Sequence, residues 1–463
     1  MLFIPLGATD TIGASCHYLN VDGTGILLDA GVDPDSEGLA SLPRLEILDE
    51  NPGWTVDHVV ITHAHHDHLG SLPVLIKRYP RLCVHMTGAT RELAEILLPA
   101  SARLQRRKQQ EGTSAHAPLF DEEEVRVVDF IYSTYELNQP FDLTGGSGDT
   151  EISGTFFNSG HILGSVGVEI VAKRKAKPVR IFYSSDTNLR HQSIIPGGEY
   201  PAPGLDVLIM ESTMGADDDA TTTTRASEEE KLGKAIQRVI SRGGAVLIPA
   251  FALGRAQEVV ALIDRYKSAG LVPDDVPVYT TGSMRAIAGL YDRTRLTTPR
   301  IDPEFEVFGV QQKRHPRSTE GTRASVRKPS IHIAASGMMF QNTLSNRLAQ
   351  YMLSNENNGI FFVGFAREDS PGGALLEAAE NGKKVVLNKE RGPQKIKCEI
   401  GQFRLSGHSH RDDLLELAES LDPLKTILVH GELEAREWLA GRIREGTSDQ
   451  QVLLPTVGQP IHF

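Results

Sequence analysis

The feature that most constrains this chain is a run of metal-ligand side chains directly after a β-branched segment. Val59-Val60-Ile61 leads into Thr62-His63-Ala64-His65-His66-Asp67-His68, with Gly70 close behind. Imidazole nitrogens and carboxylate oxygens bind zinc at about 2.0–2.2 Å, and this many ligands within six residues can serve two adjacent ions. A histidine-rich loop in solvent is the alternative, but the strand before the run and the helix predicted over 72–78 argue against it. The run predicts a metal site.

One run cannot complete two sites, and further ligand-type residues follow other predicted strands. Strands are expected at 26–28, 181–183, 207–210 and 426–429. The carboxyl ends of strands form sites in open α/β sheets, so these side chains are expected to converge. Each alone could be a turn or capping residue. The residues concerned are Asp29, Asp186, Glu211 and His430, with His161 between glycines as a further candidate.

Short apolar runs alternate with amphipathic stretches along the chain, which predicts an α/β fold. A second series of such units predicts a parallel-sheet domain inserted into the first domain. The expected domains are 1–212, 213–392 and 393–463, the first and last forming one fold. In the insert we expect a helix from a Ser227–Glu230 capping box and surface loops at 216–224 and 311–330. The strands expected there are 245–248, 276–279, 331–333, 360–363 and 385–387.

Composition narrows the function classes. The net charge of −12 argues against a purely electrostatic nucleic-acid binder, so any such binding needs a local cationic site. No apolar run approaches the roughly 20 residues that span a bilayer, and the first residues do not resemble a secretory leader. The three cysteines form no CxxC pair and are expected to be reduced, buried thiols of a cytoplasmic protein without a membrane partner.

The order of these motifs resembles the metallo-β-lactamase superfamily, and specifically its β-CASP nuclease branch of the RNA-processing type. The resemblance extends over essentially the whole chain and implies an αββα sandwich interrupted by a β-CASP domain of α/β class. The matching segments are LLDAG with Asp29, the HAHHDH run, His161, YSSDT with Asp186, IMEST with Glu211, LSGHS with His408, LVHGE with His430, and two insert signatures at 249–255 and 335–338.

The resemblance also implies how two zinc ions would be held. Asp186 would bridge them, and Asp29 would orient a ligand from behind, as metal-binding side chains require. The first ion would be bound by His63, His65 and His161, and the second by Asp67, His68 and His430.

The expected activity is hydrolysis of a phosphodiester by a metal-activated hydroxide, leaving a 5′-phosphate and a 3′-hydroxyl. Asp67 belongs to the catalytic set as a ligand. His408 is the candidate general acid, with Glu211 accepting a hydrogen bond from its other ring nitrogen. The alternatives for His408 are a ligand of a third site or a buried structural histidine.

Single-stranded RNA is the expected substrate. RNA-processing members of the family carry histidine at the position of His430, whereas DNA-repair members carry valine. Substrate contacts are expected from Ser336 and Gly337 at a strand-to-helix turn and from Arg255, although a structural ion pair is equally plausible for Arg255. Lys313 and Arg314 begin a basic stretch that either binds phosphates or is solvated.

The sequence departs from the family in two places. His410 stands where the family usually has an aspartate, and 364–369 lacks the usual glutamine-alanine pair and the threonine after it. A DNA nuclease of the same fold, a small-molecule hydrolase and a non-catalytic scaffold are competing interpretations. Endo- and exonuclease action both stay open. Little sequence follows His430, so a monomer or weak homodimer is expected.

Overall fold

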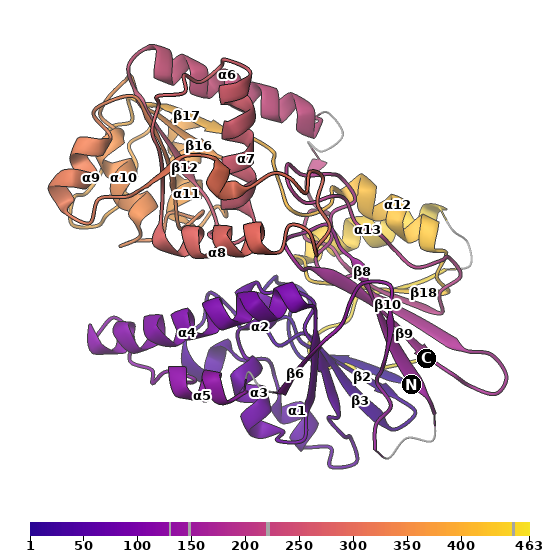
Figure 1. Ribbon diagram of the computed structural model, residues 1–463. Coiled ribbons are helices and arrows are strands. Elements are labelled where there is room, and N and C mark those ends of the chain that lie inside the picture. Colours follow the sequence, from indigo (N-terminus) through magenta and orange to yellow (C-terminus); the bar gives the residue numbers. More distant parts are fainter. Residues whose placement is uncertain (129–130, 147–149, 219–222, 447–449) are drawn as a thin grey trace. The chain divides into compact units, whose positions relative to one another are not determined.

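The computed structural model describes residues 1–128, 131–146, 150–218, 223–446 and 450–463. It divides into two compact units (Figure 1). The first contains residues 1–191, 197–221 and 408–463, and the second contains 192–196 and 222–407. The chain therefore leaves the first unit and returns to it, as expected for an inserted domain.

The first unit contains two seven-stranded mixed sheets. The first sheet has the order β20 (Ile461–His462), β1 (Leu2–Pro5), β2 (His17–Val21), β3 (Thr24–Leu28), β4 (His58–Val60), β5 (Cys83–Met86) and β6 (Tyr132–Thr134). The second has the order β19 (Gln451–Leu453), β18 (Lys425–Val429), β11 (Val207–Glu211), β10 (Val179–Tyr183), β9 (Val166–Ala172), β8 (Ile152–Asn158) and β7 (Pro140–Asp142).

Successive side chains of each strand point to opposite faces of its sheet, and the two sheets pack face to face through their apolar faces. On β11, Val207 and Ile209 lie in one apolar core with Phe3 and Ile26 of the first sheet. Leu208 and Met210 point the other way, toward the helices α12 (Arg411–Leu421) and α13 (Leu433–Gly446). Helices of the N-terminal part cover the outer side of the first sheet (Figure 1). They are α1 (Glu46–Asp49), α2 (His66–Leu69), α3 (Leu72–Arg78), α4 (Gly88–Gln110) and α5 (Glu122–Val128).

The expected αββα sandwich is thus confirmed. The strand expected at 59–61 is β4 at 58–60, one residue earlier. The helix expected over 72–78 is α3.

The second unit is built on one six-stranded sheet whose pairings are all parallel. Its order is β14 (Gln312–Arg314), β13 (Val278–Thr280), β15 (Ser330–Ala334), β12 (Ala245–Pro249), β16 (Gly359–Phe362) and β17 (Glu399–Gln402). The helices are α6 (Arg225–Ser241), α7 (Arg255–Ser268), α8 (Gly282–Arg293), α9 (Thr319–Ser325), α10 (Leu344–Met352) and α11 (Pro371–Glu380). The predicted parallel-sheet α/β insert is confirmed.

Three local predictions for this unit were wrong. The segment 385–387 forms only an isolated bridge between Val385 and Gln394, because β16 already has β12 on one side and β17 on the other. The stretch 311–330 is not a loop, since β14 pairs with β13 there and Ser318 caps α9. The helix α6 begins at Arg225 because Thr224, and not Ser227, is its N-cap. The loop expected at 216–224 lies partly outside the described residues.

The division into units also differs from the predicted boundaries at 212 and 392. β17 pairs with β16, so the chain stays in the second unit until residue 407. The short segment 192–196 belongs to the second unit as well. Its backbone N–H groups at Ser193, Ile194 and Ile195 donate to the buried carboxylate of Glu258 on α7.

Candidate metal centre

The ligand-type residues of the first unit come from the carboxyl ends of strands in both sheets. Asp29 directly follows β3 and His430 directly follows β18, whereas His63 and Asp186 each come three residues after the last residue of β4 and β10. Asp29 and His430 have φ values of 64° and 51°, in the left-handed region. Non-glycine residues there cost on the order of 1–3 kcal/mol, and such positions concentrate at functional sites.

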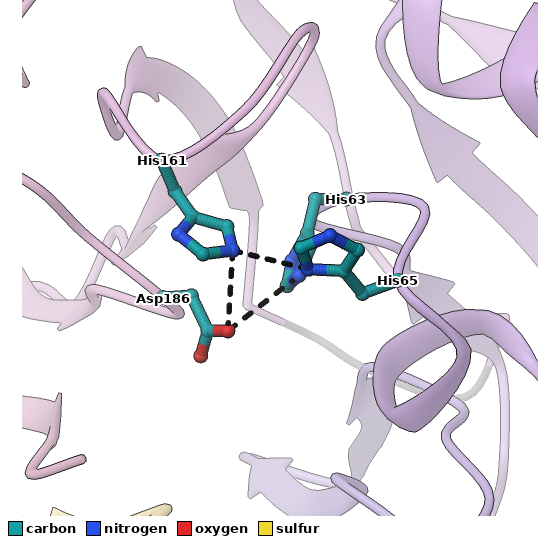
Figure 2. Close-up of side chains that lie close together, drawn as sticks. All are labelled: His63, His65, His161 and Asp186. Carbon is teal, nitrogen blue, oxygen red and sulfur yellow. Dashed lines mark hydrogen bonds and ion pairs between the residues drawn. The ribbon is translucent and has the colours of Figure 1, made fainter. Parts of the chain in front are cut away.

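The first group of ligand atoms comprises His63, His65, His161 and Asp186, which lie within 4.8 Å of one another (Figure 2). The Nε2 atom of His161 is 3.1 Å from Nδ1 of His65. Oδ2 of Asp186 is 3.6 Å from Nε2 of His63 and 3.6 Å from Nε2 of His161. Three imidazoles and one carboxylate oxygen therefore face a common point.

The second group comprises Asp67, His68 and His430. The Nε2 atoms of the two histidines are 3.1 Å apart. Oδ2 of Asp67 is 3.6 Å from Nε2 of His430 and 4.0 Å from Nε2 of His68. The other oxygen of Asp186, Oδ1, lies 3.3 Å from Nε2 of His68. One carboxylate thus reaches both groups, with a different oxygen toward each.

These side chains fit a metal better than they fit one another. Nε2 of His63 is buried without a hydrogen bond among the described residues. Oδ1 of Asp186 lies close to two imidazole nitrogens, at 3.3 Å from His68 and 3.2 Å from His430. Burial lowers the pKa of His63 well below 6.5, so its imidazole is neutral. A buried polar atom without a partner costs roughly 1–3 kcal/mol, which a cation at this point would offset. Nitrogen and carboxylate donors are the set that zinc takes.

Asp29 contacts the ring nitrogen of His68 that faces away from the ligand groups. Its Oδ2 lies 2.8 Å from Nδ1 of His68 and accepts a hydrogen bond from the Tyr183 hydroxyl at 2.9 Å. Its Oδ1 accepts from both the backbone N–H and the hydroxyl of Thr62, each at 2.8 Å. With its Nδ1 engaged in this way, His68 directs Nε2 toward the ligand group. Sequence reasoning named Asp29 but missed Thr62 and Tyr183, which carry no motif of their own.

His408 lies beside the first group. Its Nδ1 is 3.0 Å from Oε2 of Glu211, and its Nε2 is 4.0 Å from Oδ2 of Asp186. Burial disfavours the imidazolium, but the two carboxylates outweigh it and raise the pKa of His408 to about 9. Glu211 also accepts the Thr187 backbone N–H. Glu211 also forms a third close group with Asp186 and His430, but His408 is not among its ligand atoms.

Two other histidines near the motifs have different surroundings. His66 turns away from the ligand groups, and its Nε2 lies 2.9 Å from the Ser101 hydroxyl on α4. His410 is the N-cap of α12, and its backbone N–H donates to Asp413. Asp413 in turn accepts two hydrogen bonds from Arg190. The residue that departs from the family pattern therefore begins a helix directly after His408.

The predicted substrate-contact residues all lie in the second unit, outside the ligand groups. Arg255 opens α7 and bonds the side chain of Gln192, and burial lowers its pKa to about 10. Lys313 and Arg314 are exposed on the edge strand β14. Ser336 bonds within its own loop, where its hydroxyl accepts from the Phe340 N–H. Gly337 lies in that loop against the ring of Phe251.

Three family models match the chain. The metallo-β-lactamase superfamily model matches residues 10–155, and the Beta-Casp domain matches 256–375. A model described as the Zn-dependent metallo-hydrolase RNA specificity domain matches 393–455. The last match begins at residue 393, where the sequence predicted the final domain to begin. In the structure the chain returns to the first unit 15 residues later, at 408.

Several curated proteins are similar over most of the chain. Endoribonuclease YSH1 of Kluyveromyces lactis is 28% identical over 93% of this chain and 55% of its own length. Endoribonuclease YSH1 of Saccharomyces cerevisiae is 28% identical, with 93% and 54% covered. Cleavage and polyadenylation specificity factor 73 of Drosophila melanogaster is 26% identical, with 92% and 59% covered. The chain thus spans little more than half the length of these relatives.

A crystal structure of a protein of unknown function from Enterococcus faecalis V583 has a similar fold, with a TM-score of 0.57 at 13% identity and 99% of each chain covered. Among the described residues, no helix has the length and apolarity needed to cross a membrane. The ligand groups, the two-unit fold and the three matched models lead to one conclusion. The chain belongs to the β-CASP branch of the metallo-β-lactamase superfamily.

Proposed function

We propose that this chain is a zinc-dependent endoribonuclease that cleaves single-stranded RNA and leaves a 5′-phosphate and a 3′-hydroxyl. The observation that carries the proposal is the position of Asp186. Its two oxygens face two separate groups of histidine and aspartate ligand atoms. This is the geometry that a pair of adjacent cations requires.

In the proposed site His63, His65 and His161 would hold the first zinc, and the second group of ligand atoms would hold the other. Two zinc ions supply a nucleophile from water near neutral pH and neutralise charge on the phosphate. The second group is Asp67, His68 and His430, with Asp186 shared between the two.

His408 would donate the proton that the departing oxygen needs. The hydrogen bond of its Nδ1 with Glu211 leaves Nε2 pointing toward Asp186 and the ligand groups. A carboxylate behind the ring favours the protonated form, which is the state a general acid must start from. Glu211 is therefore a positioning residue, and His408 is the catalytic one.

Preference for RNA has three supports. The histidine at position 430 matches the RNA-processing pattern of the family. The matched C-terminal model is described as an RNA specificity domain. The similar curated proteins are named endoribonucleases.

A cytoplasmic location and a monomer or weak homodimer complete the proposal. Cys16 and Cys398 are buried free thiols, as a reducing compartment permits, whereas the predicted burial of Cys83 is wrong because this residue is exposed.

The test compares end-labelled RNA and DNA of one unstructured sequence, with and without a chelator. We expect internal cuts in the RNA, 5′-phosphate ends on the downstream products, and no cutting after the metal is removed. Restoration by zinc would identify the ion. Preferential cutting of DNA would instead favour the alternative of a DNA nuclease, and a stable tetramer in light scattering would contradict the expected oligomeric state.

A further inference from the structure

Three exposed phenylalanines lie at one edge of the sheet in the second unit. Phe251 follows β12, Phe340 follows β15 and Phe365 follows β16. They are 48%, 44% and 55% exposed. Because β15, β12 and β16 are consecutive neighbours and run parallel, their carboxyl ends meet at one edge. We call these three residues the phenylalanine ledge.

The backbone around the ledge is anchored, so the exposure of the rings is built into the fold. Met339, which precedes Phe340, is fully buried, and its carbonyl accepts from the Asn346 side chain at 2.8 Å. Its φ of 57° lies in the left-handed region, which a non-glycine residue adopts only when its surroundings impose it. Phe365 is likewise held between Gly364, whose carbonyl accepts from Gln402, and the buried Ala366.

The three loops also contact one another. A Cβ atom at Gly337 would lie 3.2 Å from the ring of Phe251, so the loop after β15 packs against that ring. The N–H of Gly372 donates to the carbonyl of Met338 at 3.0 Å, which joins the loop after β16 to the loop after β15. The loops that carry the three exposed rings are therefore held against one another, and clustered exposed apolar side chains mark interaction sites.

Charge at this edge favours a polyanion over a second apolar surface. The loops 250–254 and 335–343 contain no acidic residue. Arg347 is exposed near the start of α10, whereas Arg255 at the start of α7 is only partly exposed and is bonded to Gln192. The helices α7, α10 and α11 all begin at this edge, where their N-terminal dipoles add positive potential. The loop after β16 differs from the other two, since it contains the exposed acids Glu368 and Asp369, and Arg367 pairs with Asp369.

We infer that the phenylalanine ledge stacks the unpaired bases of a single-stranded RNA. This inference rests on the proposed function, and it adds what the ligand groups cannot supply, namely a requirement for unstacked bases. Aromatic rings stack any base without reading its sequence, so the ledge would select single strands over duplexes.

The test uses the intact, metal-loaded protein and the double variant Phe340→Ala with Phe365→Ala. Stacking contributes roughly 5-fold in affinity per ring at its low end. We expect KM for an unstructured RNA to rise about 25-fold or more, with kcat within about twofold of wild type. An RNA with abasic positions should already show a raised KM in wild type, and the double variant should raise it no further.

Two further variants separate stacking from folding. Phe365→Trp, with residue 340 unchanged, should keep KM near wild type because the ring is retained. Phe308→Ala removes a ring that is 40% exposed in the same unit but precedes β14, so KM should not change. An unchanged KM in the double variant would overturn the inference. It would also be overturned if wild type were a dimer and the double variant a monomer in light scattering, because the ledge would then be a self-association surface.

Photo-crosslinking of RNA containing 4-thiouridine distinguishes failure of the ledge from failure of the proposed function. Crosslinks are expected in the loops 335–343 and 363–370. RNA that crosslinks there but is not cleaved would refute the nuclease and keep the ledge. RNA that is cleaved but crosslinks only elsewhere would refute the ledge and keep the nuclease.

Discussion

Both units place their candidate functional residues at the carboxyl ends of parallel strands, but with opposite chemistry. In the first unit those ends carry ionisable side chains such as Asp29, His63 and Asp186, each at most 2% exposed. In the second unit they carry apolar rings that are about half exposed. In both units the candidate site lies at the same kind of sheet edge, and the chemistry of the side chains there determines which partner it can bind. Buried ligands that lack hydrogen-bond partners favour a cation, whereas anchored exposed rings favour a flat apolar partner.

The largest effect is expected from Asp67→Ala, which removes a carboxylate from the second ligand group. Cleavage of RNA should fall by more than about 100-fold, since even residues behind the ligands typically cost 10–100-fold. Metal analysis of the purified variant should show less than two zinc ions per chain. Normal cleavage by this variant would refute the site assignment and would remove the contrast between the two units.

His408→Ala should lower kcat by about 10²–10⁴-fold, the usual contribution of a general acid. Metal content should stay at the wild-type value, because His408 is assigned to proton donation. The pair of readouts separates the two roles predicted for His408 from the sequence, general acid and metal ligand. Unchanged turnover would exclude the general acid, and loss of one metal ion would make His408 a ligand.

Asp29→Asn should weaken metal affinity by roughly 10–100-fold while the fold is kept. The neutral amide no longer favours the orientation and basicity of His68. Competition with a chromogenic chelator measures the affinity. Tyr183→Phe is the matched control, because it removes only one of the hydrogen bonds to Asp29. If both variants bound metal equally well, Asp29 would have no role behind the ligands.

The smallest effect concerns the stability of the second unit at low pH. His332 is buried and His315 is partly buried, and burial lowers their pKa values to about 3 and about 4. Both folded pKa values lie below the unfolded value of 6.5, so the unfolded chain binds protons first as the pH falls. The free energy of unfolding is therefore highest above pH 6.5 and decreases as the pH falls toward 4. Each histidine should cost roughly 1.4 kcal/mol per pH unit in that range.

Hydrogen exchange of the peptide covering β15 at pH values from 7 to 5 measures this loss, after correction for the intrinsic pH dependence of exchange. His332 stacks on Tyr279 with ring centroids 4.9 Å apart, so His332→Phe can keep the stacking while removing the titration. The variant should show a shallower dependence on pH. An equally steep dependence would assign the acid sensitivity to other groups.

Sequence reasoning succeeded where the signal was local. The strands before Asp29, Asp186 and His430 and the parallel insert follow from apolar runs and their spacing. It failed for 385–387, whose apolar residues look like a strand although the sheet has no free position beside β16. It also failed for β14, since three polar residues become a strand only because an edge of β13 is available. The sequence did not predict the exposed rings of the ledge, because the type of a residue does not tell whether its side chain is buried or exposed.

The sequence by itself determined which ligand-type side chains this protein has, in what order, and after which strands. Only the tertiary structure decided how they meet. His68 and His430 are 362 residues apart, yet their Nε2 atoms lie 3.1 Å from each other. The face-to-face packing of two sheets brings them there, and it turns one oxygen of Asp186 toward each group. Distances of this kind depend on the packing of the whole core, which no local pattern encodes.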